Sequence, residues 1–127
     1  MILLYIALGG AVGAVARYGV GGWVQDRAGF AFPWGTLVVN VVGSLLIGFT
    51  LRYVEAVRLG PEIRALLAVG VLGAFTTFST FSYETVALLE EGAWRRALAY
   101  TIGSVALGIV AVYAGMLLSA NVLHGRS

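Results

Sequence analysis

The stretch Gly73-Ala-Phe-Thr-Thr-Phe-Ser-Thr-Phe81 is polar in a part of the chain where the neighbouring residues are largely apolar. It lies inside the apolar run 63–89, so a helical rise of about 1.5 Å per residue places it near the centre of a membrane span. Hydroxyl side chains compete for backbone hydrogen bonds, and glycine weakens a helix. The stretch therefore predicts a break in this span, which a bilayer tolerates only where protein or water satisfies the freed backbone groups.

The composition of the chain is that of an integral membrane protein. Of its 127 residues 60% are apolar, and the mean hydropathy is +0.93, outside the usual range of soluble domains. The chain has no cysteine, which excludes disulfides and thiolate metal sites, and its one histidine, His124, lies in a tail expected to be solvated. No basic cluster exceeds Arg95-Arg96, so we expect no nucleic-acid partner.

Four membrane spans are predicted within a single domain covering 1–127. The first apolar run is similar to a signal peptide, but no basic segment precedes it and it continues to Trp23, so we interpret it as a retained span. Pro33 begins the second helix, and Gly60-Pro61 separates the second helix from the third. The predicted spans are 2–24, 34–54, 62–90 and 94–118.

Polar residues recur on single faces of these spans. Thr36, Asn40 and Ser44 are spaced four apart, as are Tyr100 and Ser104. They either join helices, at on the order of 0.6 kcal/mol per hydrogen-bonded pair, or line a hydrated path. An amide is costly to bury, so for Asn40 we favour the path.

The first span is rich in glycine and contains one charged residue. Glycines three and four apart, such as Gly9 and Gly13, predict close packing against a neighbouring helix. Arg17 lies about two turns before the predicted end of the span. Its side chain could extend to the membrane interface or face an aqueous vestibule.

The distribution of arginines indicates how the chain inserts. Four spans place both termini and the second link on one side, with Arg52, Arg58, Arg64 and Arg126. The other side carries Arg17, Arg27, Arg95 and Arg96. Orientation follows an asymmetry in such counts, and each side here has four arginines. We therefore expect insertion in both orientations and an antiparallel homodimer with its two-fold axis in the membrane plane.

Three motifs carry a resemblance that covers nearly the whole chain. They are Gly9-Gly-Ala-Val-Gly-Ala-Val-Ala-Arg-Tyr18, Gly35-Thr-Leu-Val-Val-Asn-Val-Val-Gly-Ser44 and the opening stretch. In order and placement they are similar to those of the Fluc family of bacterial fluoride channels, also called CrcB. The resemblance implies an all-α protein of the bacterial inner membrane whose third helix is broken. It also implies an antiparallel, dual-topology homodimer with two pores that passively exports fluoride, lowers cytoplasmic fluoride and is not an enzyme.

The resemblance also implies roles for individual residues. Asn40 would be the pore-lining amide, and Phe78 and Phe81 the ring pair along the route of the ion. The hydroxyls of the same route would be those of Ser79, Thr80, Tyr100 and Ser104. Backbone carbonyls of Gly73 and Thr76 from both subunits would surround a structural sodium ion at the dimer centre. Arg17 and Glu84 would lie near a vestibule and a pore end.

These roles agree with the chemistry of fluoride, which is small and strongly hydrated. A pore must replace its water with hydrogen-bond donors without holding the ion too tightly, and amide and hydroxyl groups are such donors. The positive edge of a phenylalanine ring attracts an anion weakly. The first half of a broken helix ends in exposed carbonyls that carry partial negative charge, which suits a cation.

Two other functions compete with the channel. A small dual-topology, proton-coupled multidrug exporter would need a titratable carboxylate deep in the membrane. The acidic residues of this chain lie in or beside the links, apart from Glu84, which is about two turns from the end of its span. A membrane scaffold would use its polar residues only to join helices, and would not need hydroxyls and rings together at mid-depth.

Overall fold

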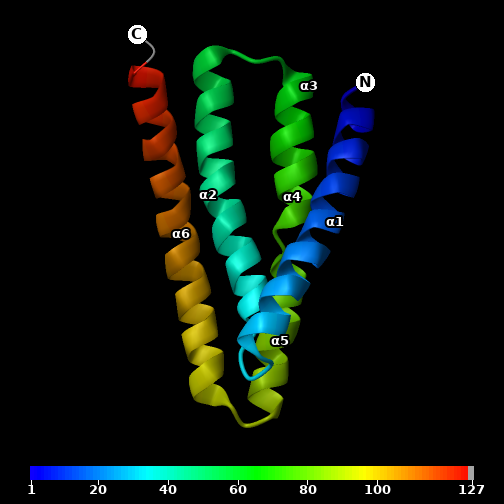
Figure 1. Cartoon of the computed structure of the whole chain (residues 1–127), viewed down its shortest axis with the longest axis vertical. Coiled ribbons are helices and arrows are strands. Elements are labelled where there is room, and N and C mark those ends of the chain that lie inside the picture. Colours follow the sequence, from blue (N-terminus) through cyan, green and yellow to red (C-terminus); the bar gives the residue numbers. More distant parts are fainter. Residues whose placement is uncertain (126–127) are drawn as a thin grey trace.

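The structure is a computed structural model that describes residues 1–125, and within that range it is helical apart from short links (Figure 1). Four stretches are long and apolar enough to cross a membrane, which confirms the predicted number of spans. The first, second and fourth are α1 (Ile2–Ala28), α2 (Trp34–Val57) and α6 (Trp94–His124). The third is composed of α3 (Pro61–Arg64), the π-helix η1 (Ala65–Leu72), α4 (Gly73–Phe75) and α5 (Phe78–Glu90).

Three helices extend further than the sequence predicted, and α2 continues past position 54 to Val57. Helix α1 continues past position 24 to Ala28 and ends at Gly29, whose φ of 89° is a conformation that favours glycine. Helix α6 continues past position 118, so most of the expected C-terminal tail is helical. The sequence boundaries followed the apolar composition of a bilayer core, whereas a helix continues until a residue stops it.

The predicted break in the third span is present and involves two residues. Helix α4 ends at Phe75, and Thr76 (φ −86°, ψ 157°) and Thr77 (φ −150°, ψ 123°) are extended. Helix α5 then begins with Thr77 as its N-cap, because the Thr77 hydroxyl accepts a hydrogen bond of 3.2 Å from the Thr80 N–H. The break thus ends one helix and caps the next.

The π-helical turns of η1 were not predicted. A π-helix has i→i+5 hydrogen bonds, and its turns commonly occur at functional sites. Segment η1 packs directly on α1, where a Cβ on Gly13 would collide with the carbonyl oxygen of Val71. A Cβ on Gly70 would lie only 2.9 Å from the Cα of Gly9. The predicted close approach of a helix to Gly9 and Gly13 is therefore confirmed.

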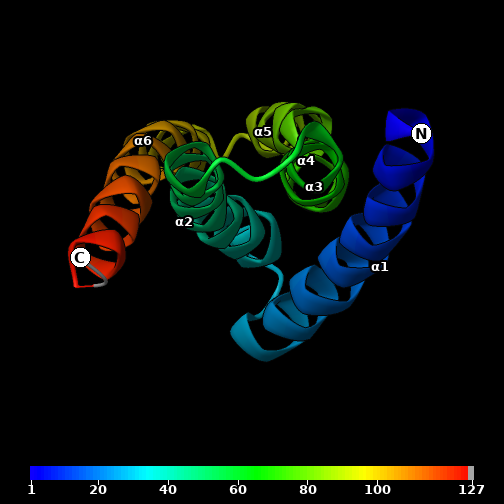
Figure 2. The same cartoon turned by 90° about the horizontal axis from the view of Figure 1, so that it is seen from above.

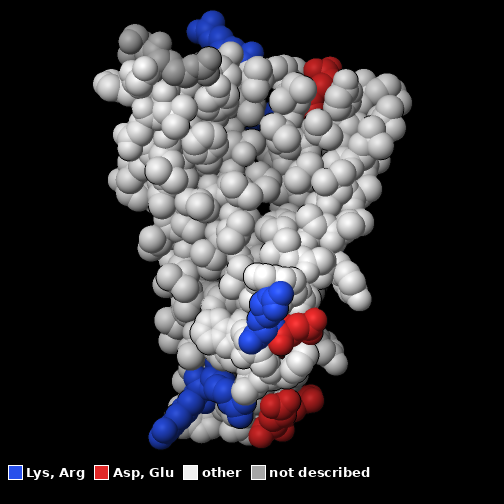
Figure 3. All heavy atoms as spheres, in the orientation of Figure 1, with Lys and Arg blue, Asp and Glu red and all other residues white. Residues whose placement is uncertain are grey.

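Helix α2 occupies the middle of the bundle and packs closely on α6. Viewed from above, α1 and α6 form opposite edges, with α2 and the third span between them (Figure 2). A Cβ on Gly48 would collide with the Val112 carbonyl oxygen, and one on Gly115 with that of Leu45. The face shown in Figure 3 has charged side chains at both ends and none across the middle, as a bilayer requires.

Candidate functional site

The side-chain amide of Asn40 holds the break in the third span. Its Nδ2 donates to the Thr77 carbonyl oxygen at 3.0 Å, and its Oδ1 accepts from the Thr77 N–H at 2.8 Å. In a continuous helix the Thr77 N–H would donate to the carbonyl of Gly73. Asn40 therefore replaces a helical hydrogen bond, and one N–H of its amide remains for another acceptor.

Arg17 also bonds to the broken helix. Its Nε donates to the Ala74 carbonyl oxygen at 3.1 Å. In a continuous helix that carbonyl would accept from the N–H of Phe78, which here begins the next helix. The side chain is half-buried and bonds to another span, so it lies against the bundle and does not project freely away from it.

A row of aromatic rings leads from the break to the link between α1 and α2. The centroids of Phe78 and Phe81 are 5.8 Å apart, those of Phe81 and Tyr100 are 5.0 Å apart, and Phe32 meets Tyr100 edge-on at 5.5 Å. Tyr100 is fully buried, whereas 79% of the Phe78 side chain is exposed. The outer end of the row is therefore open to lipid or to a second chain.

Two polar groups of α6 differ in their partners. The hydroxyl of Tyr100 donates to a carboxylate oxygen of Glu84 at 3.0 Å. The buried Oγ of Ser104 has no hydrogen-bond partner among the described residues. A buried hydroxyl without a partner costs free energy, so an unpaired Ser104 favours a ligand or a partner that supplies one.

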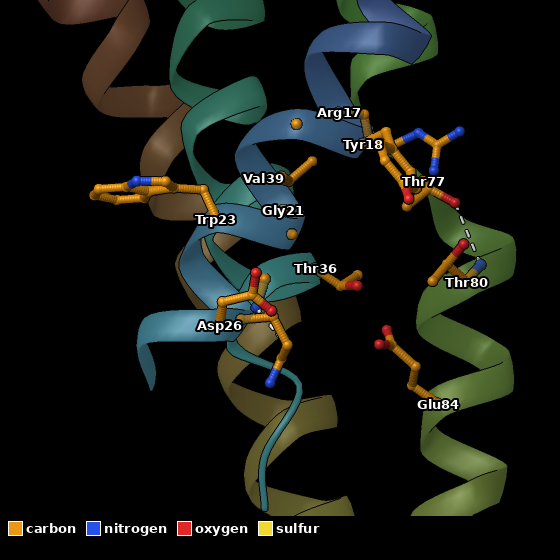
Figure 4. A pocket seen from close by; sticks show the side chains of 14 residues that line it. Arg17, Tyr18, Gly21, Trp23, Asp26, Thr36, Val39, Thr77, Thr80 and Glu84 are labelled. Carbon is orange, nitrogen blue, oxygen red and sulfur yellow. Dashed lines mark hydrogen bonds between the residues drawn. The ribbon is translucent and has the colours of Figure 1, made fainter. Parts of the chain in front are cut away.

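A cavity of about 630 Å³ opens between α1, the first turns of α2, and α5. Figure 4 shows Thr36 and Glu84 pointing toward one another across it. Arg17, Thr77 and Thr80 also line this cavity. The arrangement offers an arginine, three threonines and the two carboxylates of Asp26 and Glu84 to a hydrated ion.

The structure brings some of the predicted site residues together and leaves others apart. Arg17, Thr80 and Glu84 share the cavity, whereas Asn40 lies behind it at the break. Phe78, Phe81 and Tyr100 belong to the ring row, and Ser104 is half-buried on α6 with its Oγ buried. Gly73 is the first residue of α4 and Thr76 follows its last, and Ser79 is exposed, with its Oγ 3.4 Å from the Thr77 hydroxyl.

Sequence reasoning did not single out two residues that shape the site. Thr77 was expected only as part of the polar stretch, although a hydroxyl before a resumed helix is a typical N-cap signal. Gln25 accepts from the Gly35 N–H and donates to the carbonyl oxygens of Gly29 and Phe32. No sequence pattern indicated that role, because its partners are grouped only by the fold.

Comparisons with known proteins agree on one family. The family described as "CrcB-like protein, Camphor Resistance (CrcB)" matches residues 4–116. A protein of Thermus thermophilus described as "Fluoride-specific ion channel FluC" is 54% identical over 112 residues, which cover 88% of each chain. Proteins with the same description from Rhizobium meliloti and Hahella chejuensis are 51% and 50% identical, over 91% and 95% of this chain and 94% and 96% of theirs.

Proposed function

The chain belongs to the family of CrcB-like proteins, and from that membership we propose that it is a fluoride-specific ion channel through which fluoride leaves a bacterial cell passively. Membership confirms the resemblance inferred from the three motifs. The observation that carries the proposal is about 50% identity, over most of both chains, to proteins described as fluoride channels. The alternative function of a multidrug exporter is not supported, because the relatives named above are described as fluoride channels. The chain is a multi-pass bacterial membrane protein.

The channel is an antiparallel homodimer with two pores. A single chain leaves Phe78 and Ser79 exposed beside the break, so another surface must enclose a path for an ion there. The equal numbers of arginines on the two sides support insertion in both orientations. Arg126, one of the arginines counted, lies outside the described residues.

Fluoride passes the break along donors and ring edges. The remaining N–H of Asn40 and the hydroxyls of Ser79, Thr80, Tyr100 and Ser104 replace the water of the ion. The edges of Phe78 and Phe81 attract it weakly, so it is not trapped. The unpaired Oγ of Ser104 supports this role, because a passing ion could accept a hydrogen bond from its hydroxyl.

A structural sodium ion fits the break. The Thr77 N–H donates to Asn40, and the Thr80 N–H donates to the Thr77 hydroxyl, so Gly73 and Thr76 each lose the donor that a helix would give their carbonyls. The Ala74 carbonyl is occupied by Arg17. In an antiparallel dimer the Gly73 and Thr76 carbonyls of both subunits would hold sodium, whose charge would offset part of the cost of an anion at mid-membrane.

The cavity beside Arg17 is the vestibule of the pore. The guanidinium attracts anions at its own part of the cavity, which Asp26 and Glu84 also line, and the threonines provide hydroxyl donors. Glu84 lies on α5, across the cavity from Thr36 (Figure 4), and its hydrogen bond with Tyr100 positions both side chains beside the ring row. An ion thus passes from a hydrated cavity to the break.

Fluoride efflux from liposomes tests this function. Purified protein in vesicles loaded with fluoride should release it when an ionophore compensates the charge, as measured with a fluoride electrode. Vesicles loaded with chloride should retain it. Release of both halides at equal rates, or of neither, would overturn the proposal.

The orientation of the C-terminus tests the antiparallel dimer. A tag at the C-terminus should be accessible from both sides of the same membrane, in similar proportions. A tag found on one side in every preparation would exclude dual topology, while leaving fluoride conduction itself open to the efflux assay.

A further inference from the structure

We propose that the end of the molecule formed by the α2–α3 link binds an anionic phospholipid, with its phosphate at Arg58 and Arg64 and an acyl chain in the groove below. The two arginines line one cavity of about 470 Å³, together with Glu55, Leu51, Val54 and Leu59. Two guanidinium groups therefore face one carboxylate. The link joins two membrane spans, so this cavity lies at the depth of lipid headgroups.

The arginines at the two ends of the molecule differ in their partners. Arg96 donates to the Ala31 carbonyl oxygen at 2.7 Å, and Arg27 and Arg95 lie over the rings of Trp23 and Trp94. At the α2–α3 end, the side chains of Arg58 and Arg64 are exposed and make no hydrogen bond, ion pair or ring contact with another described residue. Their donors are thus available to a ligand from outside the chain.

The backbone fixes Arg58 beside this cavity. Arg58 has φ 56° and ψ 45°, the left-handed conformation that ends α2, and its N–H donates to the Val54 carbonyl oxygen. The Leu59 N–H donates to the same carbonyl at 3.1 Å, so two backbone hydrogen bonds hold this turn. Left-handed backbone is unfavourable for a residue other than glycine, and no other described residue except glycine has positive φ.

An apolar groove continues from the cavity toward the middle of the membrane. It has a volume of about 360 Å³ and shares Leu51 and Arg64 with the upper cavity. Its walls come from α1, α2 and the first turns of the third span, and they include Ile2, Ile6, Ile47, Ala65, Ala68 and Val69. A cationic cavity continuous with an apolar groove suits a phosphodiester with an acyl chain, because basic pockets between spans bind anionic headgroups.

Lipid binding measured by native mass spectrometry tests the site. Delipidated protein should bind phosphatidylglycerol more tightly than phosphatidylcholine with the same acyl chains. One arginine beside an anionic headgroup contributes on the order of fivefold in affinity, so R58Q/R64Q should weaken phosphatidylglycerol binding about 30-fold. R27Q/R95Q, at the other end, is the matched control and should keep the wild-type preference. Equal binding of both lipids, or an unchanged preference in R58Q/R64Q, would overturn the proposal.

A photoreactive benzophenone side chain at Val69, which is 56% exposed, identifies what fills the groove. Irradiation in phosphatidylglycerol vesicles should give a lipid adduct, and its yield should fall in R58Q/R64Q. A cross-link to a second copy of the chain would instead assign the groove to the dimer interface and overturn the lipid site. Glycerophosphate, a soluble headgroup without an acyl chain, should leave the yield unchanged even in excess. A fall in the yield would mean that the arginines bind the headgroup alone and that the groove is not part of the site.

Discussion

Asn40 bonds to both backbone groups of Thr77, with distances of 2.8 Å to the N–H and 3.0 Å to the carbonyl oxygen. These bonds join the second span to the third span at the point where the third span is not helical. Of the two roles that the sequence left open, the structure shows that Asn40 joins helices, through one N–H and its carbonyl oxygen. The second N–H of the amide is the one that the proposed pore would use.

Asn40→Asp should lower fluoride efflux by about 10- to 100-fold. The carboxylate cannot donate to the Thr77 carbonyl, and an unpaired buried polar group costs about 1–3 kcal/mol. Efflux from liposomes measures the effect, and size-exclusion chromatography checks the assembly. Val42→Ala, on the same helix but 39% exposed, is the control and should conduct normally. Normal flux in Asn40→Asp would show that neither the pairing nor the free N–H matters.

Phe78→Ile should lower fluoride efflux about two- to tenfold, because a ring edge contributes on the order of 1 kcal/mol to a favourable contact. The side chain is 79% exposed in the single chain, so the substitution removes little packing within it. Tyr83→Ile, 77% exposed on the same helix, is the matched control and should have no effect. Equal losses of flux in both variants would remove the special role of Phe78.

Arg17→Gln should lower fluoride efflux about fivefold at low salt, because a charge at the vestibule contributes on the order of 1 kcal/mol to attracting an anion. The deficit should shrink as ionic strength rises and screens the charge. Arg17→Lys should restore attraction at low salt, although it loses the Nε bond to Ala74. A deficit independent of salt would mean that the bond, and not the charge, is what conduction needs.

Thr77→Ala should lower the free energy of unfolding by about 1 kcal/mol, because α5 loses its N-cap. Thermal unfolding in detergent measures the change. Thr77→Ser keeps a hydroxyl that accepts from the Thr80 N–H and should remain close to wild type. Equal destabilisation by alanine and serine would assign the effect to the methyl group of threonine.

Gly48→Ala should destabilise the protein by about 1–3 kcal/mol, since the added methyl collides with the Val112 carbonyl and forces α6 away from α2. Gly103→Ala is the matched control on α6, because a Cβ at this position would have no described neighbour within 4 Å beyond its own stretch of helix. It should be neutral or slightly stabilising, as alanine favours helix. Similar unfolding temperatures for the two variants would contradict the close packing of α2 on α6.

Much of the fold could be predicted from local sequence. Long apolar runs predict membrane spans, and Gly60-Pro61 is a strong signal for the end of a helix. The hydroxyl-rich stretch predicted the break because its side chains compete with the backbone. The ends of the helices were predicted less accurately. Apolar composition indicates which residues lie within the bilayer core, but it does not indicate which residue ends the helix.

The arrangement of the site was partly predictable. Spacing placed Asn40 on a polar face, but no spacing within α2 could indicate Thr77, which lies on another span. The sequence left two placements of the Arg17 side chain open. In the structure its Nε donates to the Ala74 carbonyl oxygen. The π-helix Ala65–Leu72 was not predicted from the sequence, although the glycines of α1 that pack against it were.

The sequence by itself determined that this chain spans the membrane four times and that its third span cannot be one continuous helix. Both follow from local physical chemistry, the transfer of apolar side chains into lipid and the competition of hydroxyls for the backbone. Only the tertiary structure decided which groups satisfy the break: Asn40 for Thr77, and Arg17 for Ala74. Those pairings join residues far apart in the chain, so they exist only once the helices have packed.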